Sequence, residues 1–280
     1  MAQIHPTSVI EDGAELADDV IVGPLCYVAS GAAIGAGTRL VAQATVLGGT
    51  TLGERNTVWP HATLGADPQD LKYAGEQTTL TIGDHNEIRE NVTMHRGTAN
   101  GGGTTAVGSD NLFMAGTHVA HDCRVGNRCV FANNVLLAGH IVVEDHAVIG
   151  GGVAIHHFVT VGQFAYIGGL SGVTHDCPPF MRSDGHPNRV RGFNDVALKR
   201  HRFPDESIER VREAYKRQFR QSNDSGVRKT SESLSALEAD YPEDECITIL
   251  CQFMRRTMIG VHGRYLETLR MDKKPTNPVK

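Results

Sequence analysis

Apolar residues recur at every sixth position along most of the first 173 residues of the chain. The position after each apolar residue is often Gly or Ala, and the fifth position of each six-residue unit is usually small or β-branched. One phase held over so many units predicts a structural repeat instead of a succession of unrelated helices and strands. The apolar positions are Ile4, Ile10, Leu16, Val22, Val28, Ile34, Leu40, Val46, Leu52, Val58, Leu64, Ile82, Ile88, Met94, Val107, Phe113, Val119, Val125, Phe131, Leu137, Val143, Ile149, Ile155, Val161, Ile167 and Val173.

Each six-residue unit fits a short strand followed by a corner, with its first and fifth side chains pointing inward. Three units close a triangular coil of 18 residues, and successive coils stack at about the 4.8 Å spacing of a β-sheet. A small residue at the second position lets the backbone bend at the corner. No unit buries its apolar face alone, so stability comes from stacking. We therefore expect a mainly β protein, a parallel β-helix of hexapeptide repeats.

The repeat is interrupted twice and then ends. Loop excursions are expected at 70–81, where the phase survives because Leu64 and Ile82 are 18 residues apart, and at 97–106, a Gly-rich stretch. Excursions from a rigid solenoid are where functional loops usually lie, although the second could be a plain surface insertion. After Val173 the apolar period becomes helical. We predict a β-helix over residues 1–189 and a small C-terminal α-helical domain over residues 190–280.

Charge and composition exclude some functions. The formal net charge of −5 argues against a broad basic surface for nucleic acid. The N-terminus lacks the basic start and apolar run of a signal peptide, and no apolar stretch reaches the roughly 18 residues of a transmembrane helix. The six cysteines form no CxxC pair, which favours a reduced, cytoplasmic chain with buried thiols.

Histidines gather between residues 118 and 157, where the 18-residue period predicts their arrangement. Residues 18 apart share a column along a β-helix, so Gly139 should lie over His121 and below His157. In the next column His140 should lie over Asp122. Because Gly139 has no side chain, it leaves a notch with an exposed backbone N–H above the His121 ring. Two further histidines should reach the same face: His118 and His156.

These residue types suit acid–base catalysis. His121 is the expected general base, since imidazole exchanges protons near neutral pH. Asp122 or a nearby carbonyl would orient its ring and stabilise the protonated form, and the Gly139 N–H would stabilise a tetrahedral oxyanion. Cys123 occupies an inward position, so no protein nucleophile stands beside His121. We expect direct attack by a substrate hydroxyl or amine, without a cofactor or metal.

Two alternatives stay open for the histidines. They could be solvated side chains on a scaffold without catalytic function. Three of them could also hold Zn²⁺ with one open position, as in the γ-class carbonic anhydrases, which share this type of fold. The notch beside His121, the helical domain and the loop that carries Asp70 and Lys72 argue against the metal site.

Several short motifs lie at the interruptions and the histidine-rich turns: Asp70–Glu76, His95–Thr98, Gly108–Asn111, Ala120–Cys123, Val125–Asn127, Leu137–His140 and Leu198–Arg200. In these motifs the chain resembles the UDP-N-acetylglucosamine O-acyltransferases over essentially its whole length. The resemblance implies a left-handed β-helix and a homotrimer with active sites between adjacent β-helices. It also implies transfer of a 3-hydroxyacyl chain from acyl carrier protein to the 3-OH of UDP-N-acetylglucosamine, the first step of lipid A biosynthesis.

The resemblance also assigns roles to residues at matching positions. His121 would be the general base and the Gly139 N–H the oxyanion donor. Asn194 and Arg200 would hold the UDP and pantetheine side of the cleft, and the basic segment around Arg200 and Arg202 would suit an acidic carrier protein. The residues expected to contact the sugar nucleotide or the acyl group are Asp70, Lys72, His118, His140 and His156.

His157 departs from the pattern of this family, which usually has Gln at that position, beside the acceptor sugar. The departure keeps a second reaction open, N-acylation of a UDP-sugar that carries a 3-amino group. The family often has a second Arg where His201 stands, and the segment 183–190 matches only loosely. We therefore count His157 among the substrate-binding residues whose substitution would bear on the choice of acceptor.

Overall fold

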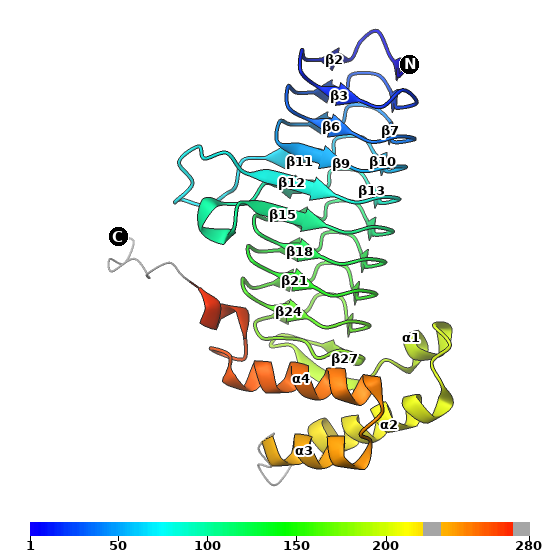
Figure 1. Ribbon diagram of the computed structural model, residues 1–280, viewed down its shortest axis with the longest axis vertical. Coiled ribbons are helices and arrows are strands. Elements are labelled where there is room, and N and C mark those ends of the chain that lie inside the picture. Colours follow the sequence, from blue (N-terminus) through cyan, green and yellow to red (C-terminus); the bar gives the residue numbers. More distant parts are fainter. Residues whose placement is uncertain (221–230, 271–280) are drawn as a thin grey trace.

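The structure, a computed structural model, describes residues 1–220 and 231–270. The chain forms the predicted left-handed parallel β-helix, followed by a group of short helices at the end opposite the N-terminus (Figure 1). The predicted helical domain over 190–280 thus includes residues 221–230 and 271–280, which lie outside the described residues.

Three long sheets form the faces of the β-helix. Sheet A contains β1 Gln3–Ile4, β4 Ile21–Val22, β7 Arg39–Leu40, β10 Thr57–Val58, β13 Glu87–Ile88, β16 Leu112–Phe113, β19 Val130–Phe131, β22 Val148–Ile149, β25 Tyr166–Ile167, β27 Met181–Asp184 and β28 Arg189–Phe193. Sheet B contains β2 Val9–Ile10, β5 Tyr27–Val28, β8 Thr45–Val46, β11 Thr63–Ala66, β14 Thr93–His95, β17 His118–Val119, β20 Leu136–Leu137, β23 Ala154–Ile155 and β26 Gly172–Val173. Sheet C contains β3 Glu15–Leu16, β6 Ala33–Ile34, β9 Thr50–Leu52, β12 Thr79–Ile82, β15 Thr104–Val107, β18 Arg124–Val125, β21 Val142–Val143 and β24 Thr160–Val161.

Strand pairing follows the 18-residue period wherever no loop intervenes. Ile4 pairs with Val22, and Val119 with Leu137, each in the neighbouring parallel strand. The first and fifth side chains of the units, such as Val22 and Val20, are buried in one continuous apolar core. Periodic burial of this kind fixes the register, because a slip by one residue would turn the apolar side chains outward.

The turn between sheets B and C places one residue of each coil in the left-handed region of backbone dihedral space. Asp122, His140 and Phe158 occupy this position in three successive coils, with φ of 61°, 61° and 64°. Residues other than glycine adopt such values uncommonly, so the turn is over-determined by the stacking on either side. Its consequence is that these three side chains line one edge of the β-helix.

Two excursions project from one edge of the β-helix (Figure 1). The first joins β11 to β12, and the second joins β14 to β15 and contains the short helix η1, Ala99–Gly101. The ranges expected from the lapsed repeat, 70–81 and 97–106, overlap the beginnings of β12 and β15. Thr79–Ile82 pairs with β9 although it lacks the hexapeptide signature, because extended backbone and buried Leu80 suffice for pairing.

The end of the β-helix is closed by an antiparallel hairpin of β27 and β28, so the predicted boundary at residue 189 falls on the first residue of β28. The segment beyond it packs around a second apolar core. No helix in the described ranges is long and apolar enough to cross a membrane. The helices are α1 Asp195–Arg200, α2 Asp205–Tyr215, the π-helical η2 Lys216–Arg220, α3 Ser231–Asp240, α4 Glu245–Ile259 and the 3₁₀ turn η4 Leu266–Leu269.

Candidate active site

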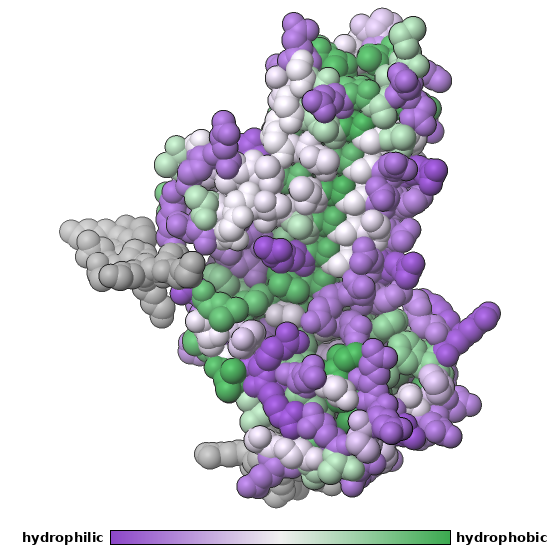
Figure 2. Space-filling model, in the orientation of Figure 1, coloured by the Kyte–Doolittle hydropathy of each residue, from purple (hydrophilic) through white to green (hydrophobic). Residues whose placement is uncertain are grey.

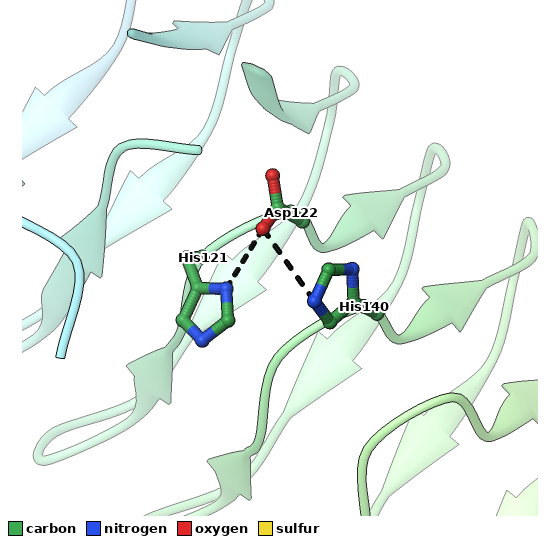
Figure 3. A group of neighbouring side chains, drawn as sticks. All are labelled: His121, Asp122 and His140. Atoms are coloured by element: carbon green, nitrogen blue, oxygen red, sulfur yellow. Dashed lines mark hydrogen bonds and ion pairs between the residues drawn. The ribbon is translucent and has the colours of Figure 1, made fainter. Parts of the chain in front are cut away.

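The His121–Asp122 pair lies at the turn that joins β17 to β18. The Nδ1 atom of His121 is 2.8 Å from a carboxylate oxygen of Asp122. The Asp122 side chain is 1% exposed and the His121 side chain 13%. With Nδ1–H donating to the carboxylate, the acceptor nitrogen of the neutral ring is Nε2, which points away from Asp122 (Figure 3). This is the tautomer that a general base requires.

The second excursion holds the Asp122 carboxylate. The Thr98 backbone N–H donates to one oxygen at 2.8 Å, and the Thr98 hydroxyl donates to the other at 2.7 Å. Burial opposes the charge on Asp122, but hydrogen bonds from His121 and Thr98 outweigh it and hold the pKa of this carboxyl below its usual value. A side chain at Gly101 would collide with the carboxylate. The Gly-rich stretch is therefore a close cover over Asp122.

Gly139 lies against the His121 ring, as the column of residues predicts. A Cβ at this position would come 2.7 Å from Nε2, closer than real contacts allow. The neighbouring His140 N–H donates to the His121 carbonyl at 3.0 Å and fixes the spacing of the two coils. Within residues 1–220 and 231–270, the Gly139 N–H has no hydrogen-bond acceptor. A buried amide N–H without an acceptor is rare, and here it stands beside a candidate base.

His140 and Phe158 continue the site toward the next coil. The His140 ring meets the His121 ring edge-on, with centroids 5.2 Å apart, and its Nε2 is 3.7 Å from Asp122 (Figure 3). On its other side, His140 stacks on Phe158, with centroids 4.5 Å apart and planes 10° from parallel. The three rings therefore occupy the same edge of the β-helix in consecutive coils.

His156 and His157 lie on the coil beyond. Both are exposed, and their ring centroids are 4.4 Å apart. Burial, and next the neighbouring His156, lower the pKa of His157. The ring of His157 is thus disposed to be neutral near pH 7, when it offers one donor and one acceptor.

His118 and His95 form the other flank. The Thr93 hydroxyl and His118 Nδ1 are 2.7 Å apart, and the His118 ring meets the His95 ring edge-on at 4.8 Å. His95 is 6% exposed, and its buried Nδ1 has no partner in the described chain. Burial, reinforced by the neighbouring His118 and His121, lowers the pKa of His95 to about 4. Sequence reasoning did not single out His95 as a site residue, although it opens a motif just before the second excursion.

Asp70 and Lys72 lie on the first excursion. The Lys72 backbone N–H donates to the Asp70 carboxylate at 3.0 Å, and the Lys72 side chain is exposed. Arg96 anchors this loop by contacting the carboxylate of Asp67 and the Tyr73 hydroxyl. The loop extends outward from the β-helix (Figure 1), which directs these groups away from the chain's own core.

Asn194 and Arg200 lie on α1, on the other side of the β-helix from the excursions (Figure 1). The Asn194 side chain is buried, accepts from the Ala197 N–H at 3.3 Å and donates to the Phe164 carbonyl at 2.8 Å. It therefore caps the helix. Arg200 is exposed in the last turn. One chain does not bring Asn194 and Arg200 together with His121.

His121, Asp122 and His140 also meet the spatial requirement for metal ligands, since one donor atom from each lies within 4.8 Å of the others. However, Thr98 and the His121 Nδ1–H already occupy both carboxylate oxygens. A metal at this position would displace the proton between His121 and Asp122. The expectation of a metal-free site stays a prediction.

Stacked six-residue coils with a histidine–carboxylate pair and a free amide at one turn define a hexapeptide-repeat transferase. The sequence profile of the bacterial transferase hexapeptide (six repeats) matches residues 104–139, which contain the pair and Gly139. A second profile, described as UDP N-acetylglucosamine O-acyltransferase, domain 2, matches residues 176–262. Together with the solved structures described next, these matches show that the chain belongs to the UDP-N-acetylglucosamine O-acyltransferase family.

Several solved structures are similar to the chain along nearly its whole length. LpxA from Acinetobacter baumannii is 38% identical, with a TM-score of 0.84, over 89% of this chain and 95% of that one. LpxA from Bacteroides fragilis, described as a UDP-N-acetylglucosamine acyltransferase, is 39% identical, with a TM-score of 0.79, over 91% and 95%. The Arabidopsis UDP-N-acetylglucosamine acyltransferase is 33% identical, with a TM-score of 0.72, over 92% and 96%.

Proposed function

We propose that the chain is an acyltransferase that moves a 3-hydroxyacyl group from acyl carrier protein to the 3-OH of UDP-N-acetylglucosamine, the first step of lipid A biosynthesis. The observation that carries the proposal is the pairing of a base with an oxyanion donor. His121 Nε2 is directed away from Asp122, and the bare Gly139 backbone, with an unpaired N–H, lies against the same ring. Family membership indicates which substrates meet there.

In the proposed reaction, His121 Nε2 removes the proton of the sugar 3-OH while the oxygen attacks the thioester carbonyl carbon. Asp122 accepts the Nδ1–H bond and stabilises the imidazolium that forms. The carbonyl oxygen becomes an oxyanion and receives the Gly139 N–H. Collapse of the tetrahedral intermediate breaks the carbon–sulfur bond, and the carrier thiolate takes the proton back from His121. No covalent acyl-enzyme is needed, since Cys123 is fully buried.

We further propose that the working form is a homotrimer whose sites lie between adjacent β-helices. Two observations support this assembly. The loop with Asp70 and Lys72 projects from the β-helix, and Asn194 and Arg200 lie on the side away from the excursions (Figure 1). A neighbouring subunit would bring one chain's α1 toward the histidines of another. Asp70, Lys72, His118, His140, His156 and His157 would then contact the sugar nucleotide or acyl chain.

The basic residues of α1 suit the carrier protein. Arg200 and Arg202 are exposed at the end of this helix, whereas Lys199 is within 3.5 Å of Asp195. Opposite charge on the partner would speed encounter. We place the reaction in the cytoplasm, because all six cysteines are unpaired and buried, as in a reducing compartment.

One assay tests the proposed function. The purified chain is given 3-hydroxyacyl-carrier protein with UDP-N-acetylglucosamine or its 3-amino analogue, with and without chelator, and the products are identified by mass spectrometry. We expect an ester with the hydroxyl acceptor and full activity in chelator. Exclusive amide formation would favour the N-acyltransferase suggested by His157. Loss of activity on chelation would favour a metal held by His121, Asp122 and His140.

A further inference from the structure

The segment after α4 turns back onto the β-helix and reaches the coil next to the histidines. We call residues 263–270 the C-terminal clamp. The matched family profile ends at residue 262, so the clamp lies beyond the part of the chain that the profile describes. In Figure 1 it is the red segment, on the same edge of the β-helix as the two excursions.

The base of the clamp is fixed by Asp176, a buried residue near the end of the β-helix. The Asp176 N–H donates to the Gly263 carbonyl at 2.9 Å, and its carboxylate accepts the Tyr265 N–H at 3.0 Å. Arg264 is 7% exposed and donates to the Thr174 carbonyl at 2.8 Å. A backbone tied by two main-chain bonds and a buried guanidinium has a defined path over this coil.

The tip of the clamp carries an ion-paired arginine. Glu267 lies between Arg264, at 3.1 Å, and Arg270, at 3.7 Å. The Arg270 guanidinium carbon is 5.4 Å from the centroid of the Phe158 ring. A cation in this position is attracted by the face of the aromatic ring. Glu267 therefore orients Arg270 toward Phe158.

Phe158 connects the clamp to the site. It is 8% exposed and stacks on His140, whose Nε2 is 3.7 Å from the Asp122 carboxylate. The rings thus follow one another from Arg270 through Phe158 and His140 to the His121–Asp122 pair. Movement of Phe158 would leave His140 without the surface that sets its plane.

We propose that Arg270 is a positioning residue for the acyl transfer: it holds the Phe158 ring against His140 and thereby keeps His140 directed at the His121–Asp122 pair. The inference rests on the proposed function, because it assigns Arg270 a part in that reaction. It requires no contact between Arg270 and substrate. Its effect should appear in turnover and not in substrate binding.

Steady-state kinetics of full-length variants test the proposal. Arg270→Met should lower kcat about fivefold, as expected for a small misplacement of a catalytic group, with the KM for both substrates unchanged. Arg270→Lys keeps the cation and should restore most of the turnover. Arg256→Met is the matched control, since Arg256 lies 5.7 Å over Phe253 away from the histidines and should leave turnover unchanged.

A double-mutant cycle with Phe158→Leu completes the test. If Arg270 acts through Phe158, the double variant should be no slower than Phe158→Leu alone. Additive losses, an unchanged kcat in Arg270→Met, or a raised KM for the sugar nucleotide with normal kcat would each overturn the proposal. If instead the wild-type chain transfers no acyl group, the proposed function fails first, and the two failures are told apart.

Discussion

The backbone of Gly139 lies so close to the imidazole of His121 that a methyl group at residue 139 would stand 2.7 Å from Nε2. The contact joins two coils of the β-helix at the point where the Gly139 N–H has no acceptor in the described ranges. Space for a substrate carbonyl beside the base therefore depends on the absence of one side chain.

Gly139→Ala should reduce kcat by at least about 10²-fold, the usual effect of disturbing an oxyanion donor and its base. The added methyl group would push the His121 ring away from its hydrogen bond with Asp122. Turnover measured at saturating substrate checks this expectation. Gly151→Ala is a suitable control, because the nearest atom to a Cβ there is a carbonyl oxygen at 3.3 Å. Equal activity of the two variants would contradict the assignment of Gly139.

His121→Ala should lower kcat by at least about 10²-fold, because the sugar hydroxyl would lose its proton acceptor. The substitution removes a side chain that is mostly buried but makes one hydrogen bond, so the fold should persist. Circular dichroism would verify the fold, and His61→Ala, at an exposed turn, serves as the control. Near-normal turnover would remove His121 from the role of base.

Thr98→Val should lower kcat about tenfold, the effect of losing one hydrogen bond to a charged group. The hydroxyl donates to Asp122 and also accepts from the Gly101 N–H at 3.1 Å, so its loss loosens both the carboxylate and the loop. Thr98→Ser keeps the hydroxyl and should retain activity. A Val variant as active as the Ser variant would show that the loop does not support Asp122.

Stability should fall on acidification in a way that depends on His95. Its pKa is near 6.5 in the unfolded chain and about 4 in the fold, so the unfolded state binds the extra proton between these values. The stabilisation is complete above pH 6.5 and is lost as the pH falls through 4, with a total on the order of 2–3 kcal/mol. Denaturant unfolding from pH 7.5 to 4 should show a smaller loss for His95→Asn than for wild type. Parallel curves would contradict this.

His157→Gln should leave transfer to the 3-OH acceptor within about threefold of wild type, since a neutral imidazole and a carboxamide each offer donor and acceptor atoms. The lowered pKa of His157 favours the neutral ring at pH 7. Product ratios with hydroxyl and amino acceptors in competition provide the measurement. A change of preferred acceptor in the variant would show that His157 sets the choice.

The periodic part of the chain was the predictable part. Once three hexapeptide units are known to close a coil, the sequence distance between His121 and Gly139 becomes a spatial neighbourhood, and their contact follows. The same arithmetic places His140 over Asp122, where the structure finds both in one left-handed turn position. Regular stacking makes these contacts a property of local sequence.

Contacts that leave the period could not be predicted in this way. His95 pairs across a coil enlarged by the second excursion, where Met94 and Val119 are partners despite their irregular spacing. Asn194 was expected at the substrate, yet in this chain its amide caps α1 and binds the Phe164 carbonyl. The C-terminal clamp depends on the path of α4, which the apolar pattern does not encode.

The unequal coils have a consequence for how such a protein can change over evolutionary time. Leu64 pairs with Met94 and Met94 with Val119, so two inserted loops of different length leave the inner rungs aligned. An insertion at a corner therefore costs the core nothing and adds new groups at one edge. Lineages can lengthen, shorten or exchange these loops independently, and can acquire new substrate preferences without redesigning the scaffold that holds the base.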